Sequence, residues 1–361
     1  MSETPIRDDV SMNKLLISVL IALAVFVAGC NRNKADTTGS NVKVDHKKHP
    51  PPASSSEAVT HAEMKNVDFH VDDTIILRIK SLRGVLLRTN KETPPVFDDK
   101  KSFIIRIDSG TIGIRTDSLT DLLNNYVFAY PHAPLKKLNI SVEGNQIKQT
   151  GIMHKVADVP FAIVGNLSAT PEGKIRLHPS SIKAAGIPVK GLMHLFDVEL
   201  SELIKVRESR GVKIDNNDLI LDPELMVPPP EIRGRVTAVR IEGDEVIQTF
   251  GPASEPGGST RHVTPSNPKA GNYMYYQGGT LRFGKLTMTN ADLQIVDANP
   301  KDDFDFSLEH YNRQLVAGYS KNTPNFGLVV FMPDYYKVRE MSPKTNQRTG
   351  TGGNFLKPPN P

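Results

Sequence analysis

The sequence has a single cysteine, no tryptophan and no large excess of charge of one sign, and each of these features argues against a class of protein. Its one cysteine, Cys30, has no partner for an internal disulfide. It has no tryptophan and only 6% aromatic residues, so side chains that stack on nucleic-acid bases or sugars are scarce. The formal net charge is +4, and basic residues form no run longer than pairs such as Lys47-Lys48. The composition therefore does not predict a nucleic-acid-binding protein.

Short motifs that carry catalytic chemistry are also absent. The chain has no Gly-x-Ser-x-Gly elbow, no complete Gly-x-x-x-x-Gly-Lys-Ser/Thr phosphate loop, no His-Glu-x-x-His and no dinucleotide-binding glycine pattern. The ten histidines are scattered along the chain. The sequence therefore predicts no catalytic residue and no cofactor.

Two stretches invite a metal-binding interpretation. His46 and His49, with His61 beyond them, lack a set of carboxylates or thiols at metal-ligand spacing, so solvated histidines are the favoured explanation. The acidic stretch 297–303 has lysine and aspartate where an EF-hand loop needs its fifth-position oxygen ligand and its glycine. A solvated acidic turn explains it better, and the sequence predicts no metal site.

The stretch from Met12 to Cys30 has the pattern of an export signal. Lys14 precedes an apolar run over 15–27 that only Ser18 interrupts, and small residues follow it. The run is shorter than the roughly 20 residues of a membrane-spanning helix. A basic start, a short apolar middle and small residues before a cleavage site are typical of a secretory signal peptide. Because the residues before Met12 are partly acidic, we expect translation to start at Met12.

The ending Val27-Ala28-Gly29-Cys30 resembles the lipobox of bacterial lipoproteins. In that family the cysteine sulfur carries diacylglycerol and the chain is cut just before it. The resemblance therefore implies a signal peptide over 1–29, lipidation of Cys30, and a membrane anchor that faces the periplasm or the cell exterior. The alternative is an anchor helix that is never cut. Asn31 replaces the aspartate that tends to signal inner-membrane retention in enteric-type lipoproteins, which favours the outer membrane if the host has two membranes.

Composition divides the rest of the chain into folded parts and linkers. Residues 30–66 are polar and rich in proline and serine, which predicts a disordered linker after the lipidated cysteine. Two folded parts are expected, a lipid-binding-like α+β domain over 67–251 and an accessory β-rich region over 272–338. A linker over 252–271 separates them, and a disordered tail over 339–361 follows.

Alternating apolar residues predict that most of the larger part is strand. Glycine lies between such runs at Gly144 and Gly243 and predicts tight hairpin turns there. Asp108-Ser109-Gly110 predicts a further hairpin turn between strands 103–107 and 112–114.

Helical spacing of apolar residues occurs in two places. Leu119, Leu122, Leu123 and Tyr126 fall on one face, which predicts a helix. A second helical region is expected over 189–204.

The two glycine hairpins share a sequence pattern. Residues 142–150 read Val-Glu-Gly-Asn-Gln-Ile-Lys-Gln-Thr, and residues 241–249 read Ile-Glu-Gly-Asp-Glu-Val-Ile-Gln-Thr. The likeness indicates either duplicated halves or convergent hairpin chemistry. We favour convergence, because Gly-Asn and Gly-Asp are common in tight turns.

Two features of the larger part resemble the LmeA-like family of bacterial envelope proteins. One is the helix 118–128, which leads through Pro134-Leu135 into a meander. The other is the segment 177–203, in which His178-Pro179 and Ile187-Pro188-Val189 lead from strand to helix. The resemblance covers about half of the chain and implies a β-rich α+β fold related to tubular lipid-binding domains. In that fold a long curved antiparallel sheet packs with two or three helices and leaves an apolar groove for acyl chains.

A groove of this kind needs inward-facing aliphatic side chains, with methionine adaptable to different lipid chains. Ordinary core packing is the alternative for each candidate. The candidate groove residues are Ile163, Leu192, Met193, Leu195, Phe196 and Leu203. No functional residue of the family can be assigned to this chain, because no short motif matches.

The C-terminal part predicts strands and one short amphipathic helix, with a buried strand over 327–332. Tyr319, Tyr335 and Tyr336 are expected to lie at the surface, where they suit a partner interface or frame strand ends. Taken together, the sequence predicts a membrane-anchored envelope lipoprotein that binds or shuttles lipid in an apolar groove. A non-enzymatic scaffold that binds an envelope partner is the alternative, and an envelope hydrolase is the least favoured.

Overall fold

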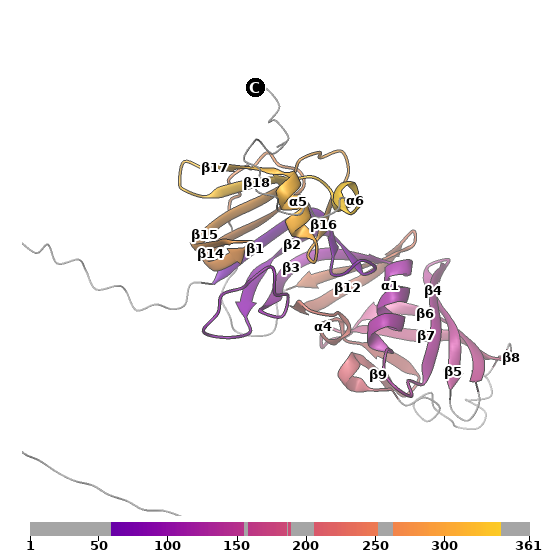
Figure 1. Cartoon of the computed structure of the whole chain (residues 1–361). Coiled ribbons are helices and arrows are strands. Elements are labelled where there is room, and N and C mark those ends of the chain that lie inside the picture. Colours follow the sequence, from indigo (N-terminus) through magenta and orange to yellow (C-terminus); the bar gives the residue numbers. More distant parts are fainter. Residues whose placement is uncertain (1–58, 155–157, 186, 189–205, 252–262, 341–361) are drawn as a thin grey trace, which may run out of the picture. The chain divides into compact units, whose positions relative to one another are not determined.

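The computed structural model describes residues 59–154, 158–185, 187–188, 206–251 and 263–340. Within these residues the fold is β-rich, with an 11-stranded mixed sheet, called sheet A, and a 7-stranded antiparallel sheet, called sheet B (Figure 1). A β-rich α+β fold with few helices is thus confirmed. The expected antiparallel pairing holds for sheet B only, because sheet A contains three parallel pairings, β1–β16, β3–β11 and β15–β18.

The two sheets are built from eleven and seven strands with the following bounds. Sheet A consists of β1 (Thr60–His70), β2 (Ile76–Arg88), β3 (Phe103–Arg115), β11 (Glu231–Arg233), β12 (Arg235–Glu242), β13 (Glu245–Gly251), β14 (Tyr273–Phe283), β15 (Leu286–Asp297), β16 (Phe304–Ser307), β17 (Tyr319–Asn322) and β18 (Leu328–Met332). Sheet B consists of β4 (Leu135–Glu143), β5 (Gln146–His154), β6 (Asp158–Ala169), β7 (Ile175–Ala184), β8 (Ile187–Pro188), β9 (Val212–Asp215) and β10 (Asp218–Leu221).

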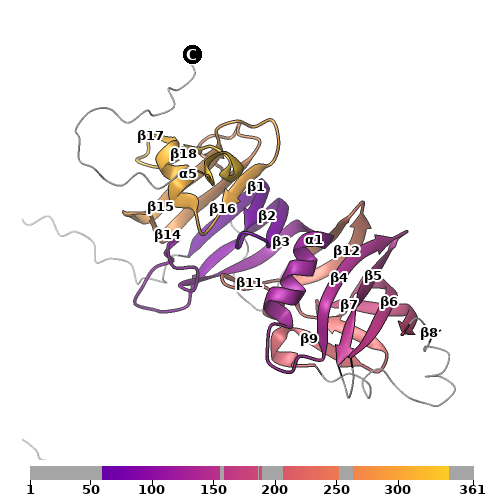
Figure 2. The ribbon, with the colours of Figure 1, turned by 45° about the vertical axis from the view of Figure 1, so that its right-hand side comes forward.

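The helices of the described residues are short. They are α1 (Thr116–Leu122), which continues as the π-helical turn η1 (Leu123–Val127), the 3-10 turn η2 (Glu208–Arg210), α4 (Pro223–Met226), α5 (Tyr311–Ala317) and α6 (Tyr335–Val338). Helix α1 lies beside β4, and α5 and α6 lie near β18 and β16 (Figures 1 and 2). In this part of the chain, no helix combines the length and apolar character needed to cross a membrane.

The predicted glycine hairpins are confirmed. Glu143 pairs with Gln146 in the β4–β5 hairpin, and Glu242 pairs with Glu245 in the β12–β13 hairpin. Gly144 and Gly243 have φ values of 64° and 62°. A side chain is disfavoured in that left-handed conformation, so glycine at the first turn position selects this tight turn.

The hairpin predicted at Asp108-Ser109-Gly110 is wrong. Strand β3 runs unbroken through these residues, and its pairing with β2 shifts register beside Arg83, which indicates a β-bulge. A β-carbon on Gly110 would stand only 2.7 Å from the carbonyl oxygen of Ser81. Glycine is therefore needed here for close approach of two strands and not for a turn.

The predicted helix over Leu119–Tyr126 is confirmed as α1 and η1. Its start is held by a long-range contact. The Ser118 hydroxyl, inside α1, donates to the carbonyl oxygen of Thr74 at 3.1 Å and accepts a hydrogen bond from the Ile76 backbone N–H at 3.4 Å. These bonds attach the helix to the β1–β2 connection. The second predicted helical region, 189–204, lies outside the described residues.

The C-terminal strands extend the sheet that the N-terminal strands begin. Met64 on β1 pairs with Met274 on β14, although the two residues are far apart in the sequence. Strand β1 begins at Thr60, ahead of the predicted boundary at residue 67, and Val263 of the predicted second linker is buried against Tyr273 and Tyr275. Because β1 pairs with both β2 and β14, the region 272–338 shares its sheet with the preceding part.

Candidate functional site

An apolar cavity of about 100 Å³ lies between the two sheets. Sheet A lines it from β2, β3, β11 and β13, and sheet B lines it from β4, β5, β6, β7, β9 and β10. Helices α1 and α4 supply further side chains. The apolar faces of both sheets belong to one buried cluster, so the cavity is a gap within a shared core.

Strand alternation explains why these residues face the cavity. Side chains two residues apart point to the same face of a strand. Ile112 and Ile114 on β3 therefore line the cavity together, as do Val246 and Phe250 on β13. The alternating pattern that predicted these strands also identifies the side chains that surround the gap.

The two related hairpins meet at this cavity. Ile147 and Gln149 on β5 occupy the positions of the shared pattern that Val246 and Gln248 occupy on β13. All four line the cavity, although β5 belongs to sheet B and β13 to sheet A. The shared pattern was the sequence signal that marked these matched positions, but it does not show that the two hairpins lie on facing sheets.

The lining contains only two polar residues. They are Gln149, which is 5% exposed, and Gln248, and each is uncharged. All the other lining residues are aliphatic, aromatic, methionine or proline. A cavity with this lining suits an apolar ligand, because a buried charge on the ligand would have no ionic partner there.

The predicted groove residues fall in two groups. Ile163, on β6, is 2% exposed and packs in the shared core, where it pairs across the strands with Gln149, but it does not line the cavity. The other five predicted groove residues lie outside the described residues, as does Cys30. They are Leu192, Met193, Leu195, Phe196 and Leu203.

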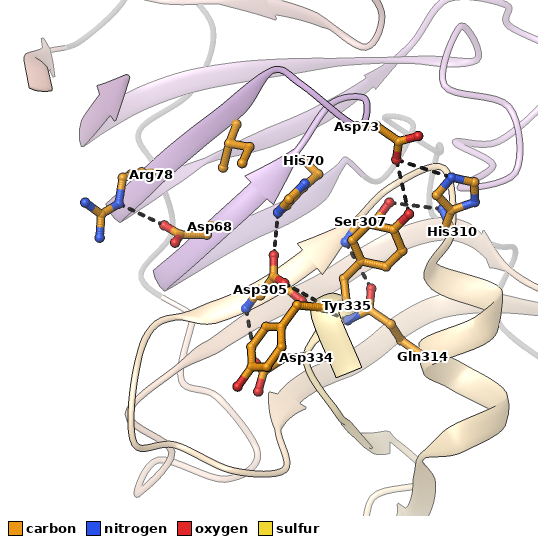
Figure 3. Close-up of polar contacts among 12 residues, drawn as sticks. Asp68, His70, Asp73, Arg78, Asp305, Ser307, His310, Gln314, Asp334 and Tyr335 are labelled. Carbon is orange, nitrogen blue, oxygen red and sulfur yellow. Dashed lines mark hydrogen bonds and ion pairs between the residues drawn. The ribbon is translucent and has the colours of Figure 1, made fainter. Parts of the chain in front are cut away.

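A polar network lies elsewhere on sheet A, where the end of β1 meets β16 and the two C-terminal helices (Figure 3). His70 on β1 contacts the Asp305 carboxylate on β16 through Nε2. Asp305 also accepts a hydrogen bond from the Tyr336 backbone N–H at 2.9 Å. The Tyr335 hydroxyl donates to Asp73 at 3.1 Å, and the His310 ring stacks on Tyr335.

Gln314 on α5 stabilises the same region from inside. The side chain is fully buried, accepts a hydrogen bond from the Ser307 N–H and donates to the carbonyl oxygens of Asp305 and Pro333, each at 2.9 Å. One side chain thereby satisfies three backbone groups, two from β16 and one from Pro333, which directly follows β18, and this favours a structural role for the network. Neither His70 nor Asp305 lines the apolar cavity.

Arg78 on β2 is surrounded by three carboxylates. Its guanidinium lies 3.2 Å from Asp68, 3.6 Å from Glu245 and 3.7 Å from Asp303. Burial raises the pKa of Asp68 and of Glu245, because the charged carboxylate loses water, and the attraction of Arg78 opposes this rise. The positive charge of Arg78 therefore offsets, at neutral pH, the cost of removing these two carboxylates from water.

The predicted tyrosine surface is only partly present. Tyr335 is buried and Tyr319 is half-buried, stacked on Phe331 with 4.7 Å between ring centroids. Tyr336 is exposed. Across the residues whose placement the structure gives, no group of three or more histidine, cysteine, aspartate or glutamate residues is arranged to hold a metal ion.

Comparison with known proteins found no match to this chain among family models, curated proteins or solved structures.

We predict that Arg78→Met lowers the free energy of unfolding by about 2–3 kcal/mol at pH 7.5, because it removes the cationic partner of the half-buried Asp68 and the buried Glu245. A carboxyl group whose pKa is raised on folding contributes stability at low pH and loses it as the pH rises through the raised value. Without Arg78 both raised pKa values rise further. The deficit should therefore shrink towards pH 4.5, because a falling pH favours the protonated, neutral form of both carboxyl groups.

Urea unfolding at both pH values measures this difference. Arg240→Met is the matched control, because Arg240 pairs with Glu242 on the exposed surface and should matter little at either pH. Equal deficits for Arg78→Met at the two pH values would show that the carboxylates around Arg78 do not depend on its charge.

Proposed function

We propose that this chain is a lipid-anchored protein of the bacterial envelope that binds an aliphatic chain of a lipid between its two sheets. The observation that carries the proposal is the apolar cavity of about 100 Å³ within the shared core. Native cores are closely packed, and gaps of this size between aliphatic side chains are uncommon. An unfilled apolar gap costs stability, so a gap with a nearly uniform apolar lining is best explained by a ligand that fills it.

The volume of the cavity limits the size of the ligand group that can enter it. Sites for whole small molecules measure about 300–1,000 Å³, whereas an engineered apolar cavity of about 150 Å³ stays dry and binds benzene. A cavity of about 100 Å³ therefore suits the end of one aliphatic chain and leaves the rest of the lipid outside it. This mode allows a protein to hold or pass on a lipid without enclosing all of it.

The sequence supports the proposed membrane anchor and the proposed location in the bacterial envelope. Residues 12–30 have the order of a lipoprotein signal, and Cys30 is the only cysteine of the chain. The cysteine would carry the lipid, and the stretch 31–58 would connect it to strand β1. The resemblance to LmeA-like envelope proteins points the same way, because that resemblance implies a β-rich fold with an apolar groove for acyl chains.

A second candidate function, the binding of a protein partner, has support near the C-terminal strands. A hollow of about 770 Å³ has a mainly polar lining that also includes Leu286, Met288 and Phe326, and Phe326 is 96% exposed. A large exposed aromatic side chain beside a hollow is typical of an interaction surface. This surface supports the scaffold alternative if the cavity proves empty.

We predict that the full chain binds cis-parinarate, a fatty acid that fluoresces in apolar surroundings, and that Val246→Phe weakens this binding at least about tenfold. The phenyl ring would occupy the space that the lipid chain needs, at a modest packing cost. Val316→Phe is the matched control, because Val316 on α5 is 74% exposed and is not part of the cavity lining. A fluorescence titration of the three proteins measures the affinities.

Two results of this titration would count against the proposal. If the wild-type chain does not bind cis-parinarate, lipid binding is wrong and the partner-binding alternative gains support. If Val246→Phe binds as tightly as Val316→Phe, the lipid binds elsewhere. Circular dichroism of each variant checks that it is folded.

We also predict that the chain produced in a bacterial host incorporates labelled palmitate and enters the detergent phase of Triton X-114, and that Cys30→Ala does neither. The thiol is the only atom of the chain that can form the thioether with diacylglycerol. Asn31→Ala keeps the thiol and should behave as wild type in both assays. An uncut, unlabelled wild-type chain that retains residues 1–29 would support the anchor-helix alternative.

A further inference from the structure

One side chain of the cavity lining carries a polar atom that an ordinary hydrocarbon chain would leave without a partner. Gln248 lies on β13 between two apolar lining residues, Val246 and Phe250. Its Oε1 atom is buried and accepts no hydrogen bond from any residue that the structure describes. A carbonyl oxygen that has lost water and gained no donor is unfavourable, and native proteins retain few such atoms.

A second amide lines the same cavity from the opposite sheet. Gln149 on β5 is 5% exposed and occupies the position of the hairpin pattern that corresponds to Gln248. Both side chains are neutral, and no charged residue is part of the lining. The cavity is therefore equipped for a neutral polar group and not for a carboxylate or a phosphate.

The unpaired Oε1 atom of Gln248 determines which neutral group of a ligand would fit. A carbonyl oxygen pairs only with a hydrogen-bond donor, so an ether, an ester or a bare alkane cannot satisfy Gln248. A hydroxyl group can donate to Gln248 and can still accept a hydrogen bond from a second amide. It also adds little volume to an aliphatic chain, which a small cavity requires.

We infer that the natural ligand is an aliphatic chain that carries a hydroxyl group, and that this hydroxyl donates a hydrogen bond to Oε1 of Gln248. The inference rests on the proposed function, because it specifies which lipid chain the same cavity selects. A hydroxylated chain gains a hydrogen bond that an unmodified chain lacks, so Gln248 sets specificity within the cavity.

The test compares two isomers that differ in the donor alone. 1-Octanol and heptyl methyl ether have the same atoms, but only the alcohol carries an O–H. Displacement of cis-parinarate by each compound gives their affinities for the full chain. We expect wild type to bind 1-octanol about fivefold more tightly than the ether, as one buried hydrogen bond would give.

Gln248→Leu should abolish this preference, because leucine fills a similar space and has no acceptor. Gln248→Met serves the same purpose if the leucine variant does not fold. Gln146→Leu is the matched control. Gln146 donates to Asn166 at 3.1 Å and to Ser180 at 3.0 Å, does not line the cavity, and should leave the preference unchanged.

The outcomes separate this inference from the proposed function. If cis-parinarate binds in the cavity and the two isomers displace it equally, the hydroxyl inference is wrong and lipid binding stands. The same conclusion follows if Gln248→Leu keeps the fivefold preference. If the wild-type chain binds none of the three compounds, the proposed function and the inference both fail.

Discussion

The structure depends on the burial of two sheet faces in one shared apolar core. Cys30 is the only cysteine, so no internal disulfide can hold the chain together. The core residues of sheet A, such as Ile112 and Val246, belong to the same buried cluster as Ile147 and Leu177 of sheet B. Burial of such side chains is the main favourable contribution to folding, so the two sheets stabilise each other.

The same constraint accounts for the cavity. Strand side chains point alternately to either face, so an apolar side chain from sheet A and one from sheet B must fill the space between them at every level. Between the residues that line the cavity, Ile147 and Val246 among them, that filling is incomplete, and a gap of about 100 Å³ remains. Two glutamines, Gln149 and Gln248, are part of the lining. Under the proposed function, a site for lipid would arise from the packing of two sheets, with no dedicated loop or catalytic motif.

Sequence reasoning predicted the local features of the fold well, because local chemistry determines them. The hairpins at Gly144 and Gly243 follow from the need for positive φ, and α1 follows from the spacing of Leu119, Leu122 and Leu123. It failed at Gly110, where the same residue type serves close strand approach instead of a turn. Turn glycines and bulge glycines have similar neighbours, and only the partner strand distinguishes them.

Non-local features could not be predicted from the sequence. The pairing of β1 with β14 joins residues such as Met64 and Met274, which no local pattern connects. The cavity residues were missed for a related reason, because a gap depends on side-chain volumes across two sheets. The likeness of residues 142–150 and 241–249 was visible, yet only the fold shows that Gln149 and Gln248 line one cavity.

The central claim is that an aliphatic chain lies between the two sheets. Intermolecular NOEs between decanoate and a deuterated full chain with labelled isoleucine, leucine and valine methyl groups test it most directly. The account predicts NOEs from the same decanoate chain to Ile147 on sheet B and to Val246 on sheet A, and none to the exposed Leu286 or Val316. NOEs to those exposed residues without any to Ile147 or Val246 would contradict the account.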